Sequence, residues 1–305
     1  MNLEVCELFC LIAEQNNMGR AAELLHMSPS AASHAISALE KELGFELLSR
    51  DRTGCRLTPH GKLLLPSFQG LLAEAVHLQE EIDQLNGLEK GFVRIGAFDS
   101  ICGNWIPQIF RTFHARYPNI EVHIYQDGYA AIESMLAEGS IDIGFLSNPS
   151  SDQFTLLPLL KDRLLCITPL HFTPKNPDFI VPEDFAGQTL ILSERGYDRT
   201  IWNYLHENGI SASPQNRIML DTSVIALVES GMGLSILPEF VLQKYPGNYR
   251  ALPLHSNICR TIHLCTLKSK RHTLACRKMI QVIQAVVASA PAAGGCLQAA
   301  VDERA

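Results

Sequence analysis

The segment from Leu25 to Gly44, LHMSPSAASHAISALEKELG, limits the possible folds of this chain more than any other stretch. Ser28 is a good helix N-cap, Pro29 fits the first helical position, and Gly44 is placed to end the helix. A buried stripe is predicted by apolar residues at intervals of four, three and four: Ala32, Ile36, Leu39 and Leu43. The opposite side of this helix carries polar, mostly short side chains: Ser30, Ser33, His34, Ser37 and Lys41.

Two further helices are predicted ahead of this segment, at residues 3–16 and 19–25, with Asn16 and Asn17 between them. Three short helices joined by tight turns indicate a helix-turn-helix, whose motif we place at about residues 18–37. A helix that enters the major groove, about 12 Å wide, needs short side chains near its N-terminus. The polar face therefore fits DNA contact, although a solvated helix face would show the same pattern.

The segment that follows favours DNA contact. Its sequence FELLSRDRTGCRLT predicts two short strands around a turn at Thr53 and Gly54. Basic residues outnumber acidic ones between Arg50 and Lys62, so this hairpin is suited to phosphate contact as a wing. The chain as a whole has a net charge of −7, so any positive surface must be local.

The run RAAELLHMSPSAASHAISALEKELGFELLSR, followed by LTPHGKLLL, resembles the winged helix-turn-helix of LysR-type transcriptional regulators. The usual family form is close to AAxxLHxSQPAxSxxIxxLExxLGxxLFxR and then LTxxG. The resemblance implies a transcriptional regulator that binds double-stranded DNA. The family's frequent Gln-Pro is replaced here by Pro29-Ser30, and its frequent Arg by His34. The expected DNA-binding residues are Ser28, Ser30, Ser33, His34, Ser37, Arg50, Arg52 and Arg56.

A long connecting helix is predicted from the Thr58-Pro59 cap to Asn86-Gly87, about 40 Å in length. Its apolar residues follow a four-three repeat that calls for a partner helix, although packing on the core of its own chain is the alternative. The resemblance implies a homodimer or tetramer that reads an interrupted inverted repeat. The expected dimerisation residues are Leu64, Phe68, Leu71, Leu78 and Ile82.

From Gly91 the pattern changes to alternating strands and helices, which predicts an α/β sheet with parallel strands in two similar units. The apolar segments LLCIT and TIHLCTLK are suited to two crossover connections between the units. This layout resembles the family's two-lobed effector domain, which is similar to a periplasmic binding protein. We expect lobe I at residues 90–162 and 265–290 and lobe II at residues 163–264.

Three loops follow strands and can place helix N-termini and neutral donors around one small ligand. Thr200 can face the same cleft. Each residue alone fits a simple helix cap, so the prediction rests on their shared location. The expected effector is small, with an anion or carboxylate as the favoured class. The expected effector-binding residues are Ser100, Cys102, Ser147, Asn148, Thr200, Thr222 and Ser223, with Ser100 and Thr222 as caps in opposite lobes.

The predicted fold class is therefore an α+β multidomain chain: a winged helix-turn-helix at residues 1–58, a linker helix at 59–89 and an effector-binding domain at 90–290. Residues 291–305 are predicted to be a disordered tail because they are rich in Ala and Gly without periodicity. No apolar run suits a membrane span, and the first residues lack a signal peptide's basic segment, so we expect a cytoplasmic location.

Nine scattered cysteines without Cys-x-x-Cys spacing predict no metal site, and no cofactor motif is found. Three other functions are the alternatives: an enzyme, a free solute-binding protein and a thiol redox sensor. An enzyme using Cys102 or His34 lacks any supporting catalytic motif, and a free solute-binding protein would not carry the winged head. A thiol redox sensor would need two reactive cysteines close together in the effector domain, and residues 193–220 contain none.

Overall fold

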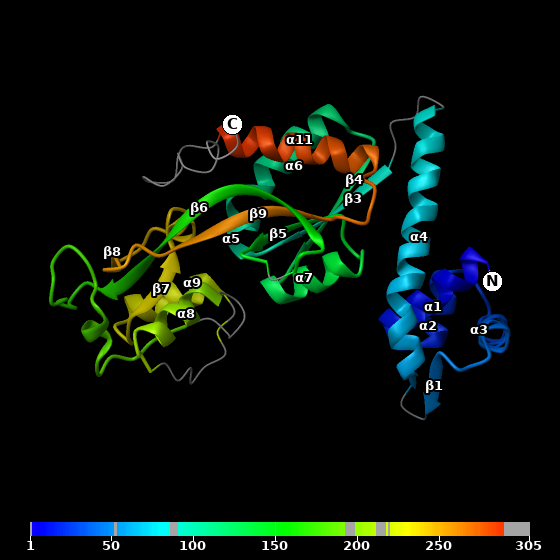
Figure 1. Ribbon diagram of the computed structural model, residues 1–305, viewed down its shortest axis with the longest axis horizontal. Coiled ribbons are helices and arrows are strands. Elements are labelled where there is room, and N and C mark those ends of the chain that lie inside the picture. Colours follow the sequence, from blue (N-terminus) through cyan, green and yellow to red (C-terminus); the bar gives the residue numbers. More distant parts are fainter. Residues whose placement is uncertain are drawn as a thin grey trace. The chain divides into compact units, whose positions relative to one another are not determined.

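The computed structural model describes residues 2–51, 54–85, 91–149, 151–192, 199–211, 218 and 220–289, without the side chains of residues 50, 51, 54, 77, 80, 81 and 83–85. The chain forms two compact units, divided between Lys90 and Gly91, with residues 138–140 grouped with the first unit. We call the first unit the head and the second the effector unit. Their elements are labelled in Figure 1.

The head is built from three short helices, a hairpin and a long helix: α1 (Leu3–Gln15), α2 (Met18–Leu24), α3 (Pro29–Leu43), β1 (Leu48–Asp51), β2 (Gly54–Leu57) and α4 (Pro59–Leu85). Side-chain oxygens of Asn2, Asn17 and Ser28 cap the first three helices. Gly44 ends α3 with a φ of 84°. The predicted stripe of α3 enters the head core, because Ala32, Ile36 and Leu39 are buried and Leu43 packs against them.

The start of α4 is fixed against the hairpin. The Thr58 hydroxyl accepts a hydrogen bond from Gly61 N at 3.0 Å and donates one to Glu46 O at 2.8 Å. A Cβ added at Gly61 would lie 2.2 Å from Leu47 O, so only glycine fits this close approach. These contacts explain why Thr and Gly occupy their positions in the LTPHG stretch.

Lobe I of the effector unit contains three parallel strands, in the order β4 (Ile120–Gln126), β3 (Gly91–Ala97), β5 (Ile143–Ser147). Its helices are α5 (Asp99–Asn104), α6 (Ile106–Arg116), α7 (Tyr129–Ala137) and α11 (Leu274–Ser289). They share one hydrophobic core with the strands. The expected return of the last helix to lobe I is thus seen in Figure 1, where α11 lies beside α6.

Two long antiparallel strands connect the lobes: β6 (Phe154–Pro169) and β9 (Cys259–Leu267). They run side by side from one lobe to the other (Figure 1), as the crossover prediction required. Lobe II adds β7 (Ser235–Pro238) and β8 (Tyr249–Pro253), both antiparallel to β6. Its helices are η1 (Pro182–Phe185), α8 (Arg199–Glu207), α9 (Asp221–Glu229) and α10 (Glu239–Leu242).

Lobe II therefore differs from the parallel unit that the sequence suggested. The expected strand at QTLILSE is reduced to a bridge between Leu190 and Leu234, and part of it lies outside the described residues. Most of the expected strand NRIMLD also lies outside them. The two lobes share a sheet order, β4-β3-β5-β9-β6-β7, because the crossover strands join their sheets.

The helix expected from Ser100 to Arg116 is in fact two helices, which meet at Trp105. The ring of Trp105 packs against Phe240 with centroids 4.8 Å apart, and this contact joins α10 to the core of lobe I. Pro107, two residues after Trp105, cannot donate a backbone hydrogen bond to extend α5. None of the helices in the described ranges is long and apolar enough to span a membrane.

Candidate functional site

The outer face of α3 presents the side chains expected to meet DNA. Ser28, Ser30, His34 and Ser37 are exposed, whereas Ser33 is half-buried. The Ser28 hydroxyl accepts a hydrogen bond from Ala31 N at 3.2 Å and lies 3.1 Å from the Ser30 hydroxyl. The face is therefore slim and rich in hydroxyl groups near the helix N-terminus, where backbone N–H groups favour anions.

The hairpin is attached to α3 through Glu40, a residue that sequence reasoning missed. Its carboxylate accepts hydrogen bonds from Leu47 N at 2.8 Å and Leu48 N at 3.0 Å. A third hydrogen bond, from Cys55 N to Asn16 O, is 3.2 Å long and ties β2 to the end of α1. Arg56 on β2 is exposed, while the Arg50 side chain and Arg52 lie outside the described residues.

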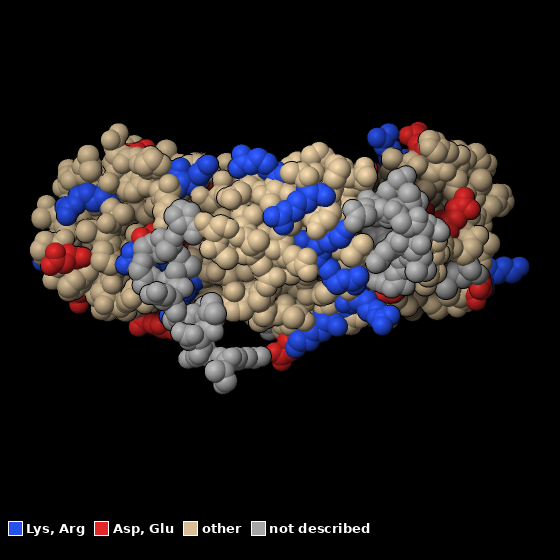
Figure 2. Space-filling model, turned by 90° about the horizontal axis from the view of Figure 1, so that it is seen from above, with Lys and Arg blue, Asp and Glu red and all other residues tan. Residues whose placement is uncertain are grey.

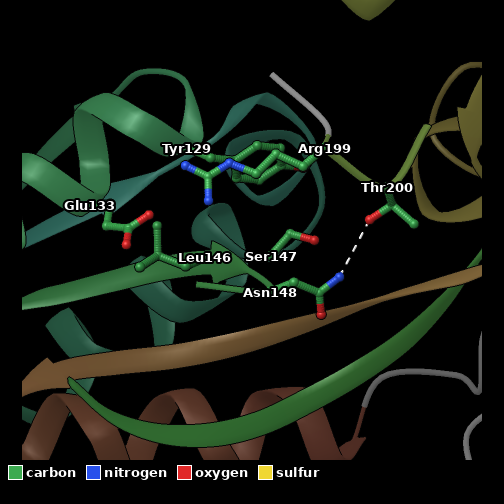
Figure 3. A pocket seen from close by; sticks show the side chains of 7 residues that line it. All are labelled: Tyr129, Glu133, Leu146, Ser147, Asn148, Arg199 and Thr200. Carbon is green, nitrogen blue, oxygen red and sulfur yellow. Dashed lines mark hydrogen bonds between the residues drawn. The ribbon is translucent and has the colours of Figure 1, made fainter. Parts of the chain in front are cut away.

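In the effector unit, a small pocket collects residues from three elements. Tyr129 and Glu133 come from α7, Leu146, Ser147 and Asn148 from the end of β5, and Arg199 and Thr200 from the start of α8. Figure 3 shows that the Arg199 side chain extends toward the α7 side of this pocket. The cavity volume is about 10 Å³, which is room for about one water molecule.

Asn148 and Thr200 connect the two lobes across this pocket. The Asn148 amide donates a hydrogen bond to the Thr200 hydroxyl at 3.3 Å, drawn as the dashed line in Figure 3. Asn148 has a φ of 45°, a left-handed conformation that Asn tolerates better than most residues. The neighbouring Ser147 hydroxyl is buried and has no hydrogen-bond partner in the described part of the chain. An unsatisfied buried hydroxyl is unfavourable, so this atom is available to a ligand.

The other expected effector residues lie elsewhere. Ser100 does not cap a helix, because α5 begins at Asp99, and Ser100 is 2% exposed. Thr222 is also no cap, since α9 begins at Asp221, and the side chains of Thr222 and Ser223 are exposed. Cys102 is half-buried, and its thiol donates to Ala97 O at 3.5 Å. None of these four lines the pocket described above.

Sequence reasoning also missed the buried network beneath the pocket. Arg260 on β9 donates to Asp162 on β6 at 2.8 Å and to the Ser100 hydroxyl at 3.3 Å. It also donates to the hydroxyl of Tyr129, which lines the pocket. Asp162 accepts a further hydrogen bond from Phe240 N at 3.0 Å. The pair thus joins the crossover strands to the pocket wall and to α10.

Three thiols of the effector unit, those of Cys102, Cys166 and Cys265, have raised pKa values. Burial raises the pKa of Cys102 to about 11, with the Asp99 charge adding to the effect. Burial likewise raises the pKa of Cys265 to about 12 and raises that of Cys166. A reactive redox cysteine needs a lowered pKa, which these three do not have. In the described ranges, no three His, Cys, Asp or Glu side chains are grouped as a metal site would require.

The apolar face of α4 divides into two parts. Phe68 is 6% exposed and packs against Phe9 with ring centroids 5.0 Å apart, so it belongs to the core of its own chain and its assignment to the dimer contact is corrected. Leu64 packs partly against the same core. Further along the helix, Leu71, Leu78 and Ile82 are 40%, 58% and 41% exposed. The second part of α4 therefore has a face that the described residues of its own chain do not cover.

Comparison with known proteins agrees with both units. Residues 3–62 match the family model of bacterial regulatory helix-turn-helix proteins of the lysR family, and residues 86–288 match the LysR substrate binding domain. The probable HTH-type transcriptional regulator LrrA of Synechococcus elongatus is 29% identical over 280 residues, which cover 88% of this chain and 92% of that protein. A probable hydrogen peroxide-inducible genes activator of Streptomyces viridosporus is 29% identical over 241 residues, 77% of each chain.

Among solved structures, a full-length OxyR variant from Pseudomonas aeruginosa has the same fold, with a TM-score of 0.74, 21% sequence identity and coverage of 98% of both chains. The first family model matches the head and the second matches the effector unit. The chain therefore belongs to the LysR family of transcriptional regulators, with a helix-turn-helix DNA-binding domain followed by an effector-binding domain.

Proposed function

We propose that this regulator responds to a small anionic effector bound in the pocket between Asn148 and Thr200, and that binding changes its DNA binding or promoter activation. The observation that carries the proposal is the buried Ser147 hydroxyl, which has no partner in the described ranges and lies beside residues of both lobes. Asn148, Thr200 and Arg199 add an amide donor, a hydroxyl and a guanidinium. Such donors suit a carboxylate or another small anion.

The effector must open the pocket in order to enter. A cavity of about 10 Å³ holds about one water molecule, so a ligand of several non-hydrogen atoms needs the walls to separate. Separation would break the hydrogen bond between Asn148 and Thr200, and the ligand would replace it. A ligand that binds only the opened arrangement shifts the population of the two states, which is a route to regulation.

The DNA-reading surface is proposed to be the exposed part of α3 with the wing. His34 and the serines of α3 would meet base edges, whereas Arg56 would contact phosphate. The roles proposed for Arg50 and Arg52 concern side chains outside the described residues. Because DNA lies in the cytoplasm of bacteria, a cytoplasmic location is part of the same proposal.

A redox function is the second candidate, because one relative is named as a peroxide-inducible activator. The raised pKa values of Cys102, Cys166 and Cys265 disfavour it, since the thiolate is the reactive form. Small-molecule sensing therefore remains the preferred function. Labelling of the native protein with a thiol reagent would decide, because a redox sensor would show a cysteine that reacts rapidly at neutral pH.

Calorimetric titration tests the effector proposal. A panel of carboxylates, phosphates and cations is first screened for thermal stabilisation, and the best ligand is then titrated into the variants Ser147→Ala and Thr200→Val. Each variant loses one hydrogen bond to a charged group, so we expect about a ten- to hundred-fold loss of affinity. Thr222→Val is the matched control, because Thr222 is exposed outside the pocket. Equal affinity in all three variants would move the effector site elsewhere.

A further inference from the structure

The effector unit has a basic surface, in addition to the pocket. The sequence from residue 240 to residue 301 contains no Asp or Glu at all, although the whole chain has a net charge of −7. Within this stretch, the turn before α11 and the first residues of α11 carry Lys268, Lys270, Arg271, Arg277 and Lys278, which we call the α11 basic patch. Figure 2 shows Lys and Arg side chains gathered over this side of the molecule.

The patch contains cations that an external ligand can reach. Lys268, Arg271 and Arg277 are exposed. Asp142 binds Lys270 at 2.8 Å and Arg94 at 2.9 Å, so two cations already offset its charge. Arg277 donates to the uncharged His272 O at 2.6 Å, and Lys278 lies 4.4 Å from the centre of the Tyr117 ring.

A histidine beside the patch is affected by the positive charges. His272 lies at the edge of the patch, and its pKa is lowered mainly by burial and further by the charges of Arg277 and Lys270, with Asp142 opposing. The patch also adjoins the N-terminus of α11, where the Thr273 hydroxyl accepts from Cys276 N at 3.1 Å. Cations at a helix N-terminus oppose the helix dipole and reduce stability. This placement therefore slightly reduces the stability of α11, and an anion bound there would offset that cost.

Phosphate groups of DNA fit this surface best. Exposed Lys and Arg side chains next to helix N–H groups are the usual donors to backbone phosphates. The chain binds DNA through its head, so phosphates are present near the effector unit at a high effective concentration. The acidic net charge elsewhere would repel DNA, which leaves a local patch as the route to contact.

We propose that the α11 basic patch binds the phosphate backbone of duplex DNA outside the segment that the head occupies. The contact is independent of base sequence and of the effector pocket. It adds affinity on long DNA and makes binding depend more steeply on salt. The alternative partner is an acidic protein surface, and the experiment below distinguishes it from DNA.

The test uses the full chain and a triple variant, Lys268→Ala with Arg271→Ala and Arg277→Ala. Binding to a mixed-sequence duplex of about 60 base pairs and to one of about 15, close to a single half-site, is measured over a range of salt concentrations. On the long duplex, the slope of log affinity against log salt should become shallower by about 2 to 3. On the short duplex, the slope should stay the same.

The matched control removes three exposed lysines outside the patch, Lys161→Ala with Lys175→Ala and Lys244→Ala, and so changes the net charge equally. The patch variant should melt no lower than the parent protein, because it loses cations next to a helix N-terminus. A slope on the long duplex equal to that of the control would overturn the proposal. If the parent then binds poly-L-glutamate and the patch variant does not, the patch belongs to an acidic protein partner instead of DNA.

Discussion

Arg260 and Asp162 are charged residues in an almost dry environment, with exposures of 2% and 1%. Removing two charges from water is costly, and the pair is tolerated because each partner is hydrogen-bonded on several sides. Arg260 contacts Asp162, Ser100 and Tyr129, and its guanidinium lies 5.3 Å from the centre of the Phe98 ring. The arrangement fixes the crossover strands to lobe I at the point where they leave it.

Replacing Arg260 by Met leaves the Asp162 carboxylate buried without its cation, so we expect the effector unit to lose about 3 to 5 kcal/mol of unfolding free energy. The double variant Arg260→Met with Asp162→Leu removes both charges and should recover a large part of this loss. Urea denaturation followed by tryptophan fluorescence measures the unfolding free energy of the effector unit, because both tryptophans of the chain, Trp105 and Trp202, lie in that unit. A double variant as unstable as the single one would refute the explanation.

Two histidines make the stability of the effector unit depend on pH. Burial lowers the pKa of His263 and of His272 below the ordinary value near 6.5. The unfolded chain therefore takes up protons first as the pH falls, and the unfolding free energy should decrease from pH 8 to pH 5.5, where carboxylates titrate little. The double variant His263→Gln with His272→Gln should flatten this decrease in urea denaturation. An unchanged pH dependence would exclude these residues as its source.

Gly61 and Gly70 lie on the same helix, α4, but in opposite surroundings. A Cβ at Gly61 would clash with the Leu47 carbonyl, whereas a Cβ at Gly70 would have no atom within 4 Å. We expect Gly61→Ala to destabilise the head by about 1 to 3 kcal/mol and to abolish DNA binding at moderate temperature. Gly70→Ala should stabilise α4 by about 0.5 to 1 kcal/mol.

Circular dichroism follows both glycine variants, and tryptophan fluorescence is the internal control, since no tryptophan lies in the head. The fluorescence transition of the effector unit should be unchanged in each variant. If Gly61→Ala melts like the parent protein, the close approach of α4 to the hairpin does not determine the stability of the head.

The elements that sequence predicted well are those whose signals are local. Ser28, Pro29 and Gly44 define α3 without reference to the rest of the chain, and the structure confirms these bounds. The break at Trp105 has a local signal in Pro107, but the contact of Trp105 with Phe240, in a distant segment, could not be predicted in the same way. The antiparallel direction of the strands in lobe II was not predicted for a similar reason, since it is set by the pairing of β7 and β8 with β6.

The pocket was predictable in part. Ser147, Asn148 and Thr200 were expected from their place after a strand or at the start of a helix, and the structure brings these three together. Tyr129 and Arg260 were missed because they are 131 residues apart and neither carries a local motif. Ser100 was assigned as a cap from its residue type, but packing uses it inside the core. Residue type and local order thus identify loop positions more readily than buried networks.

Across the whole chain, the second part of α4 is the feature that the fold leaves incomplete. Three large apolar side chains, Leu71, Leu78 and Ile82, are exposed on a helix that continues a four-three repeat. An exposed apolar stripe of this kind is characteristic of a protein interface. We therefore expect two copies of the chain to pair through these helices, which would place two heads on one DNA molecule.

The substitutions Leu71→Lys and Leu78→Lys together should prevent this pairing. In sedimentation velocity, residues 1–89 of the parent sequence should form a dimer and the double variant a monomer, because charges in the repeat oppose helix packing. Compared with the parent protein, the full-length double variant should bind DNA that carries two half-sites about a hundred-fold more weakly, since the second head is no longer tethered. The control is Leu63→Lys, because Leu63 is 73% exposed on the same helix but lies outside the repeat. A dimer that survives the double substitution, or is lost equally with Leu63→Lys, would show that α4 does not pair through this stripe.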